Sequence, residues 1–295
     1  MTLRETLLSL LEASLTPSPT VFILGFAIVL LVPIALHFIL HSSTPYNTLP
    51  SVLLIGPSGA GKTSLQTLFE RGTSTAPTHT SQVPSSVELA AATDSSVTFR
   101  DDLDALGAEA KKFLLVDTPG HAKLRRHALS KILPTASSES SQSKLKAVVF
   151  VVDAAALADG DALPATAGYL YDVLLALQKR MSGGRGSKAP PSVPVLIAAN
   201  KLDLFTALPA ALVKSNLEAE LGRVRKTRSK GLLDSSVAAD EQGEETDDWL
   251  GEYGSEKFSF KQLLEFDIEV DVIGGNVVGE GPGADKWWKW IAERV

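Results

Sequence analysis

The residues with the clearest chemical meaning lie in one short run, GPSGAGKT, at positions 56–63. It fits the pattern G-x-x-x-x-G-K-[ST], in which backbone N–H groups of a glycine-rich loop surround nucleotide phosphates. In such a loop Lys62 would reach the β- and γ-phosphates, and the Thr63 hydroxyl would ligate Mg²⁺. The run therefore predicts a site for a nucleotide and Mg²⁺. Its contacting residues are expected to be Gly56, Pro57, Ser58, Gly59, Ala60, Gly61, Lys62, Thr63 and Ser64.

A second motif, DTPGH, occupies residues 117–121 and follows the apolar run 113–116. A carboxylate at the end of a buried strand can hold the Mg²⁺ shell through water, and Asp117 stands at that place. The N–H of Gly120 can bond a γ-phosphate and report its loss. This motif predicts a loop that responds to the phosphates of the nucleotide.

A third motif, NKLD, covers residues 200–203 and follows the apolar run 195–199. The carboxylate of Asp203 can accept hydrogen bonds from N1–H and the 2-amino group of guanine, whereas adenine has neither donor. A site built on such bonds discriminates strongly. The stem of Lys201 can lie over the base, and Asn200 can tie this loop to the phosphate loop. The predicted ligands are thus GTP and GDP.

Taken singly, DTPG and NKLD could be ordinary turns at strand ends, because Asp, Gly, Pro and Asn all favour turns. All three motifs occur in order, each at the C-terminal edge of an apolar run, and that arrangement favours nucleotide binding. Together they resemble the small GTPase family. The resemblance implies an α/β fold: a P-loop NTPase G domain with a mostly parallel six-stranded sheet and helices on both faces, here over residues 50–295.

The apolar pattern supports alternating strands and helices. Strands are expected at residues 51–55, 87–100 with a break at 92–95, 112–116, 147–153, 195–199 and 266–273. Helices are expected at residues 63–71, 122–133, 162–181, 209–224 and 284–295. The acidic segment at about 234–256 contains few apolar residues and is expected to be a disordered insertion.

Composition sets limits on the class of protein. The chain has 295 residues and a net charge of -6, and no basic stripe stands out, so no direct nucleic-acid partner is expected. It contains no cysteine, which excludes disulfides and thiolate metal sites.

The N-terminal part contains a long apolar run, VFILGFAIVLLVPIALHFIL, at residues 21–40. No Asp, Glu, Lys or Arg interrupts it. A helix of this length, rising about 1.5 Å per residue, matches a hydrocarbon core of about 30 Å. We therefore expect a transmembrane helix at 21–40, between a short N-terminal segment at 1–20 and a linker at 41–49. The alternatives are a buried core helix and a cleaved signal peptide, but the run lacks a polar face and a small-residue cleavage site.

Within GTPases, the chain resembles the β subunits of the eukaryotic signal recognition particle receptor. The resemblance rests on the N-terminal span, the short linker, GPSGAGKTSL, DTPGHAKLR and NKLDL. It implies a single-pass protein of the endoplasmic reticulum membrane with a cytosolic GTPase domain. It also implies that the GTP form binds the N-terminal domain of the receptor α subunit, and that contact with ribosome or translocon is indirect. The contact surface is expected to flank Thr80 and to follow His121, and to include Leu124 and Arg125.

Two positions depart from the general GTPase pattern. The fifth guanine motif would fall at the turn of residues 273–276, where no single residue can be assigned. The threonine of the first switch loop could be Thr78, Thr80 or Ser81, and the context HTSQ favours Thr80. The expected Mg²⁺ shell is then Thr63, Thr80 and Asp117. His121 stands where Ras-like enzymes place a water-orienting glutamine, so it is the expected catalytic residue, with slow or partner-stimulated hydrolysis.

The motifs are compatible with three other functions. A translation-type GTPase shares DxPGH and NKxD, but such proteins carry β-barrel domains for which this chain has no residues left. A membrane scaffold could hold GTP and rarely hydrolyse it. An Arf-like trafficking GTPase would anchor through an amphipathic helix or a lipid, and myristoylation is excluded because Thr2 replaces the required glycine.

Overall fold

The computed structural model describes residues 19–43, 49–72, 77–91, 111–133, 145–182, 192–236, 249–251, 257–279 and 283–295. The chain divides into two compact units, Met1–Thr48 and Leu49–Val295. The first unit contains α2 (Pro19–Ser43), which includes the expected spanning segment. Among the described residues, no helix meets the combined length and apolarity that crossing a membrane requires.

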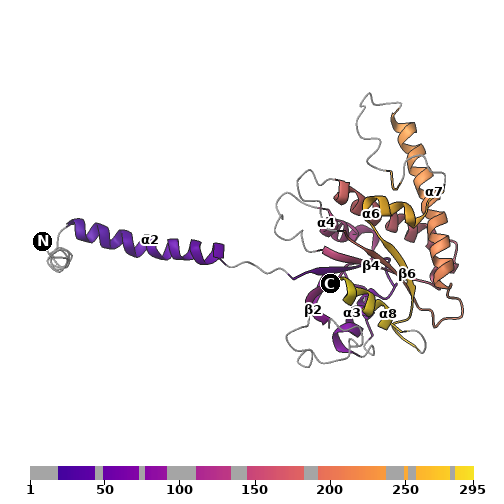
Figure 1. The fold of residues 1–295 in the computed structure, drawn as a ribbon, viewed down its shortest axis with the longest axis horizontal. Helices are drawn as coiled ribbons and strands as arrows, with labels where there is room; N and C mark the ends of the chain where they lie inside the picture. Colours follow the sequence, from indigo (N-terminus) through magenta and orange to yellow (C-terminus); the bar gives the residue numbers. More distant parts are fainter. Residues whose placement is uncertain are drawn as a thin grey trace. The chain divides into compact units, whose positions relative to one another are not determined.

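The second unit is built on a sheet with helices packed around it (Figure 1). The sheet has six strands in the order β2-β3-β1-β4-β5-β6. Strands β1, β3, β4, β5 and β6 are parallel to one another, and β2 pairs antiparallel with β3. This confirms the predicted mostly parallel six-stranded α/β fold. The strands are β1 (Ser51–Ile55), β2 (Ser85–Ala91), β3 (Lys111–Asp117), β4 (Leu145–Asp153), β5 (Val195–Asn200) and β6 (Val270–Gly274).

Helices cover both faces of the sheet because the central strands are apolar on both sides. Along β1, Leu53 and Ile55 face a core cluster shared with one set of helices, while Val52 and Leu54 face a second cluster. The first face is covered by α4 (Arg126–Ile132), α6 (Ala162–Ser182) and α7 (Ala210–Ser236). The second is covered by α3 (Lys62–Arg71) and α8 (Asp285–Arg294).

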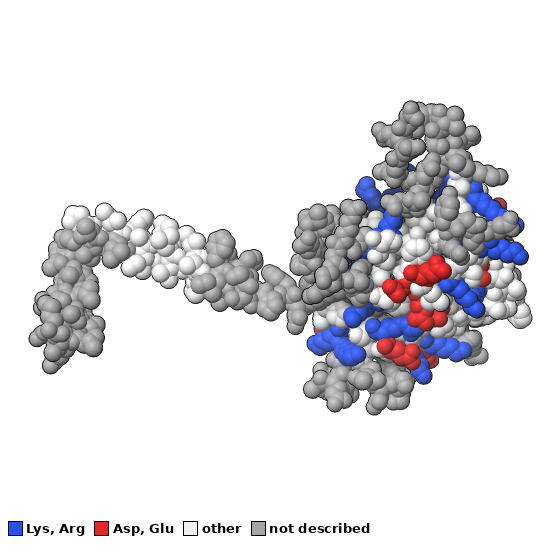
Figure 2. All heavy atoms as spheres, turned by 45° about the horizontal axis from the view of Figure 1, so that its top comes forward, with Lys and Arg blue, Asp and Glu red and all other residues white. Residues whose placement is uncertain are grey.

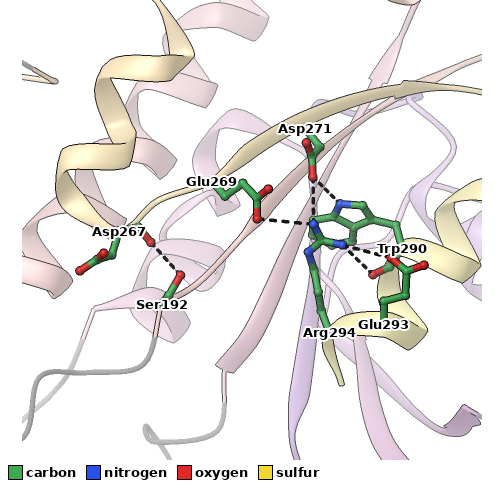
Figure 3. A network of polar contacts seen from close by, with 7 residues as sticks. All are labelled: Ser192, Asp267, Glu269, Asp271, Trp290, Glu293 and Arg294. Atoms are coloured by element: carbon green, nitrogen blue, oxygen red, sulfur yellow. Dashed lines mark hydrogen bonds and ion pairs between the residues drawn. The ribbon is translucent and has the colours of Figure 1, made fainter. Parts of the chain in front are cut away.

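The last helix is fastened to the edge strand β6 by a polar network (Figure 3). The indole N–H of Trp290 donates to Asp271 at 2.7 Å, and Arg294 donates to the same carboxylate at 3.1 Å. The Arg294 guanidinium also lies over the Trp290 ring, 4.2 Å from its centroid. Asp271 therefore joins the helix and the strand at one point.

The structure corrects several expected boundaries. The last strand begins at Val270, not at 266, because residues before it form the 3-10 helix η4 (Phe260–Phe266). The helix expected at 122–133 is divided into the 3-10 helix η2 (Ala122–Leu124) and α4. Strand β2 ends at Ala91, and residues 92–100 of the expected second strand lie outside the described residues.

The expected acidic insertion also differs from the structure at both ends. Helix α7 does not stop near 224 but continues to Ser236. Leu250 is fully buried, and the carbonyl of Trp249 accepts a hydrogen bond from Gln178 at 2.9 Å. Both ends of the segment are therefore ordered parts of the domain. Residues 237–248 and 252–256 lie outside the described residues.

Candidate nucleotide site

The loop between β1 and α3 is held by its own lysine. Lys62 begins α3, and its Nζ donates to the carbonyl oxygens of Gly56 and Pro57 at 2.9 Å each. Gly56 has a φ of 146°, and a Cβ there would lie 2.2 Å from the Val151 oxygen, so only glycine fits. The loop thus passes close to β4 and curls around the ammonium group at the start of a helix, where anions bind.

The burial of the Lys62 ammonium group favours the binding of an anion beside it. The Lys62 side chain is buried, and desolvation lowers its pKa to about 8, while the nearby charge of Asp117 raises it. A desolvated cation is stabilised when an anionic group binds beside it. The lysine predicted to reach the phosphates therefore lies in an environment that favours a bound anion.

Thr63 and Asp117 meet as the metal prediction requires. The Thr63 hydroxyl donates to Asp117 Oδ2 at 2.7 Å. Asp117 Oδ1 is buried and has no hydrogen-bond partner. Burial raises the pKa of Asp117, and the Thr63 hydroxyl, the Lys62 charge and the Ser81 hydroxyl each lower it. One hydroxyl and one carboxylate with a free oxygen suit Mg²⁺, which prefers oxygen ligands and keeps several waters.

A cavity joins the phosphate loop to two segments that are predicted to respond to the nucleotide. Residues 78–81 belong to the first switch segment, and Gly120 belongs to the second switch segment, residues 117–125. Ser64 and Thr78 share a hydrogen bond of 2.8 Å between their hydroxyls, which brings the first switch segment onto α3. Both Thr80 and Ser81 face the cavity, so the position of the switch threonine stays a prediction. The lining residues are Ser58, Gly59, Gly61, Lys62, Thr63, Ser64, Thr78, His79, Thr80, Ser81 and Gly120.

Gly120 lies directly against the phosphate loop. A Cβ at this position would come within 2.6 Å of Lys62 Nζ, of the Pro57 carbonyl carbon and of the Ser58 nitrogen. A side chain is therefore excluded, and the DTPG loop can approach bound phosphates with its backbone. The loop is also held by Thr118, whose hydroxyl donates to the Leu54 oxygen at 2.6 Å.

His121 takes a different place from the one its predicted role suggests. Its side chain is exposed, and Nδ1 accepts a hydrogen bond from the Lys123 amide at 3.3 Å. This contact caps η2, and His121 is absent from the residues that line the cavity. Its catalytic assignment stays a prediction.

Asn200 connects the NKLD loop to two other loops. Its side-chain amide donates to the Ala60 oxygen in the phosphate loop at 2.8 Å, the tie anticipated from the sequence. Its Oδ1 accepts from the Lys201 amide at 2.8 Å and from the Val277 amide at 3.1 Å. The side chain is almost fully buried, so these bonds fix three loops relative to one another.

The loop after β6 borders Asp203. This loop extends beyond the turn expected at residues 273–276. A Cβ on Gly279 would lie 2.9 Å from Asp203 Oδ2, and this glycine has a φ of 93°. Together with the bond from Val277 to Asn200, this makes residues 275–279 the neighbour of the predicted base site. In the sequence, the glycines at 275 and 279 are the signal that could have located this loop.

Asp153 is another residue near the predicted base site that the sequence motifs do not include. It ends β4 and forms an ion pair with Lys201, whose backbone has the unusual φ of 66°. Its other oxygen accepts from the amides of Ala155 and Ala156 at 3.0 and 3.1 Å. Asp153 thereby orients the lysine that is expected to lie over the base.

Arg125 also departs from the prediction, which assigns it to an exposed contact surface. Its guanidinium carbon lies 4.3 Å from the ring centroid of Tyr169, and its Nε is buried. Much of this side chain therefore points into the domain rather than toward a partner.

Comparisons with known proteins agree with these motifs. Residues 47–266 match the family model described as "Signal recognition particle receptor beta subunit". The subunit beta from Saccharomyces cerevisiae is 32% identical over 248 residues, which make up 83% of this chain and 84% of that protein. The human subunit beta is 37% identical over 186 residues, 61% of this chain and 57% of that protein.

Solved structures give the same result. The SRb-GTP/SRX complex from Chaetomium thermophilum has 51% identity and a TM-score of 0.71, and the match covers 83% of this chain and 100% of that one. The SRb-GDP-Mg structure from the same organism has 55% identity and a TM-score of 0.62, covering 85% and 100%.

Proposed function

Because this chain belongs to the family of signal recognition particle receptor β subunits, we propose that it is a membrane-anchored GTPase that binds the receptor α subunit through that subunit's N-terminal domain. The α subunit would be tethered at the endoplasmic reticulum in the GTP state for co-translational protein targeting. The observation that carries the proposal is a single cavity lined by the phosphate loop, residues 78–81 and Gly120. A partner that contacts both switch segments can detect which nucleotide fills such a cavity.

In this proposal the phosphate loop and Lys62 hold the β- and γ-phosphates, and Thr63 and Asp117 hold Mg²⁺, with Thr80 completing its shell. The fit rests on the buried, unpartnered Oδ1 of Asp117 beside the Thr63 hydroxyl. Bound Mg²⁺ neutralises charge on the phosphates. Relatives solved with GTP and with GDP and Mg²⁺ support the assignment.

Guanine selection is assigned to Asp203, with Asn200 and Lys201 in supporting roles. Asp203 is exposed in a loop that Asn200 fixes to the phosphate loop, so its carboxylate can be reached by a base whose phosphates occupy the cavity. An Asp203→Asn variant should prefer xanthine nucleotides over guanine nucleotides, because the amide can donate to O2 of xanthine. Equal binding of GTP and ATP by wild type would contradict this assignment.

Hydrolysis is proposed to be slow without a partner. The observation behind this is that His121 caps η2 and does not line the cavity. A partner that moves His121 toward the cavity would accelerate turnover. Single-turnover assays with and without the α-subunit domain test this, and a rate that does not change with the partner would favour a scaffold that holds GTP.

Membrane anchoring is assigned to α2. This helix has 25 residues and includes no Lys, Arg, Asp or Glu, and its described side chains are all white in Figure 2. Carbonate extraction should leave the full chain in the membrane pellet. A variant with Leu30→Lys and Leu31→Lys should be released, since each central charge costs about 2.5–3.5 kcal/mol of insertion free energy. Release of the unaltered chain would contradict a spanning helix.

The partner proposal is tested by affinity for the N-terminal domain of the α subunit. The full chain in detergent is loaded with GDP or with a non-hydrolysable GTP analogue. By linkage, a partner that binds the GTP form more tightly also slows the loss of GTP. Equal affinity in the two states would mean a constitutive tether, not a switch.

A further inference from the structure

Arg125 stands at the end of the second switch segment, five residues after Gly120. Its carbonyl oxygen accepts from the amides of Ala128 and Leu129 at 3.0 and 3.1 Å. Its backbone is therefore part of the first turn of α4. A movement of the segment between Gly120 and Arg125 must therefore either stop at Arg125 or displace Arg125 as well.

The side chain of Arg125 lies on an aromatic surface, and no hydrogen bond joins it to another of the residues that the structure describes. Its guanidinium carbon is 4.3 Å from the centroid of the Tyr169 ring. Arg125 Nε and the Tyr169 hydroxyl are both buried and have no hydrogen-bond partner. A guanidinium above an aromatic face is attracted by the ring, more strongly where water is excluded. The stack is thus the interaction that can hold this side chain inward.

Tyr169 is a fixed support for that stack. It is fully buried on α6, and its ring meets Phe150 of β4 edge-on, with centroids 5.6 Å apart. One turn later on α6, Asp172 pairs with Arg228 of α7 at 2.7 Å. Burial also raises the pKa of Tyr169 to about 12, so the ring stays neutral at physiological pH.

We propose that Arg125 is a positioning residue that keeps the second switch segment closed over the phosphate loop by stacking on Tyr169. Gly120 lies so close to Lys62, Pro57 and Ser58 that its position depends on where the far end of the segment is fixed. The stack fixes that end on α6. Closure places the Gly120 backbone where it can meet a γ-phosphate, so the proposal rests on the proposed binding of GTP.

The proposal makes a specific prediction for nucleotide preference. When only a fraction of molecules holds the closed position, the apparent dissociation constant for a ligand that needs closure is the intrinsic constant divided by that fraction. GTP needs closure in this proposal, and GDP has no γ-phosphate to meet Gly120. Loss of the stack should therefore weaken GTP binding and leave GDP binding unchanged.

The test uses the full chain in detergent and compares Arg125→Ala with two matched variants. Arg126→Ala removes the adjacent arginine, which is exposed. Tyr169→Phe removes only the unpartnered hydroxyl and keeps the ring. Competition with a fluorescent GDP analogue gives the dissociation constants for GDP and for a non-hydrolysable GTP analogue. Their ratio is the readout, and thermal unfolding shows that each variant is folded.

We expect Arg125→Ala to lower the preference for the GTP analogue over GDP about tenfold. Arg126→Ala and Tyr169→Phe should leave the preference within about twofold of wild type. If Arg125→Ala does not fold, Arg125→Lys serves instead, because it keeps the charge but loses the planar group, and the preference should again fall. An unchanged preference in the folded Arg125 variant, or an equal fall in Arg126→Ala, overturns the proposal. Failure of wild type to bind either nucleotide would instead refute the proposed function.

Discussion

The hydroxyl of Thr63 donates a 2.7 Å hydrogen bond to Asp117, although 54 residues separate the two in the chain. Thr63 lies in the first turn of α3, after β1, and Asp117 is the last residue of β3. Because β1 and β3 are parallel neighbours, their carboxyl ends open at the same edge of the sheet. Two residues that belong to separate motifs in the sequence therefore meet as one pair of oxygen donors, the pair proposed to hold Mg²⁺.

Removing the Asp117 charge should uncouple nucleotide binding from Mg²⁺. Mg²⁺ should increase the affinity for GDP in wild type. In Asp117→Asn this increase should be smaller by about 10–100-fold, because a neutral amide is a poor ligand for a hard cation. Dissociation constants for GDP are measured with Mg²⁺ and with a chelator. The control is Asp161→Asn, which removes an exposed carboxylate. An undiminished Mg²⁺ effect in Asp117→Asn would contradict the metal assignment.

Nucleotide binding should take up protons at mildly alkaline pH. Burial lowers the pKa of Lys62 to about 8, so near pH 8 about half of the nucleotide-free molecules carry a neutral amine. Bound phosphates favour the charged form, and GDP binding at pH 8 should then take up about half a proton. Calorimetry in two buffers of different ionisation enthalpy measures this uptake. Lys62→Arg stays charged and should show none, whereas equal uptake in both proteins would rule out Lys62 as the source.

The same shift has a consequence for stability without nucleotide. The pKa of Lys62 is lower in the folded chain than in the unfolded chain, so between about pH 8 and 10.5 the unfolded state binds more protons. The free energy of unfolding of the nucleotide-free protein should therefore receive a positive contribution from Lys62 as pH rises through this range. In Lys62→Arg that contribution should be absent.

The contact of α8 with the sheet edge should depend on Asp271. Its carboxylate accepts from Trp290 at 2.7 Å and from Arg294 at 3.1 Å (Figure 3). Asp271→Ala leaves both donors without that partner and should lower the free energy of unfolding by about 1–3 kcal/mol. Glu269→Ala is the matched control, because Glu269 contacts Arg294 at 3.5 Å and is more exposed, and it should cost below about 1 kcal/mol. Equal losses in urea unfolding would contradict the central role of Asp271.

Local sequence was enough to predict the strands and motifs at the sheet edge. Runs such as VLIAA form buried parallel strands, and parallel topology then gathers the residues that follow them. The tie between Asn200 and Ala60 could be expected for that reason. The end of α7 could not, because charged residues follow Val224 and interrupt the apolar pattern. Arg225, for example, is buried only because its guanidinium lies over the ring of Trp249, a residue distant in the sequence, with 4.7 Å between its carbon and the ring centroid.

Contacts between segments that are distant in the sequence could not be predicted either, because they form only after other elements have packed. Arg125 follows a switch motif and carries a charge, so it was expected at the surface. Its inward position depends on Tyr169, whose ring offers a stacking surface only after α6 packs on the sheet. The pairing of Asp153 with Lys201 likewise needs β4 and β5 to be neighbours in register.

Gly279 provides the sharpest test of the guanine site. A Cβ at this residue would lie 2.9 Å from Asp203 Oδ2, and its φ of 93° disfavours any L side chain. Gly279→Ala should therefore displace Asp203 and weaken GDP binding about tenfold or more. Gly160→Ala is the control, because no atom lies within 4 Å of its added Cβ.

The loss in Gly279→Ala should be specific for the base. Inosine diphosphate keeps N1–H but lacks the 2-amino group of guanine, so a well-placed Asp203 prefers GDP over it. Displacement of the carboxylate should reduce that preference, whereas damage to the phosphate loop would weaken both ligands equally. Competition titrations with the two diphosphates distinguish these results. A GDP preference in Gly279→Ala equal to that of wild type would mean that the loop at 275–279 does not border the base.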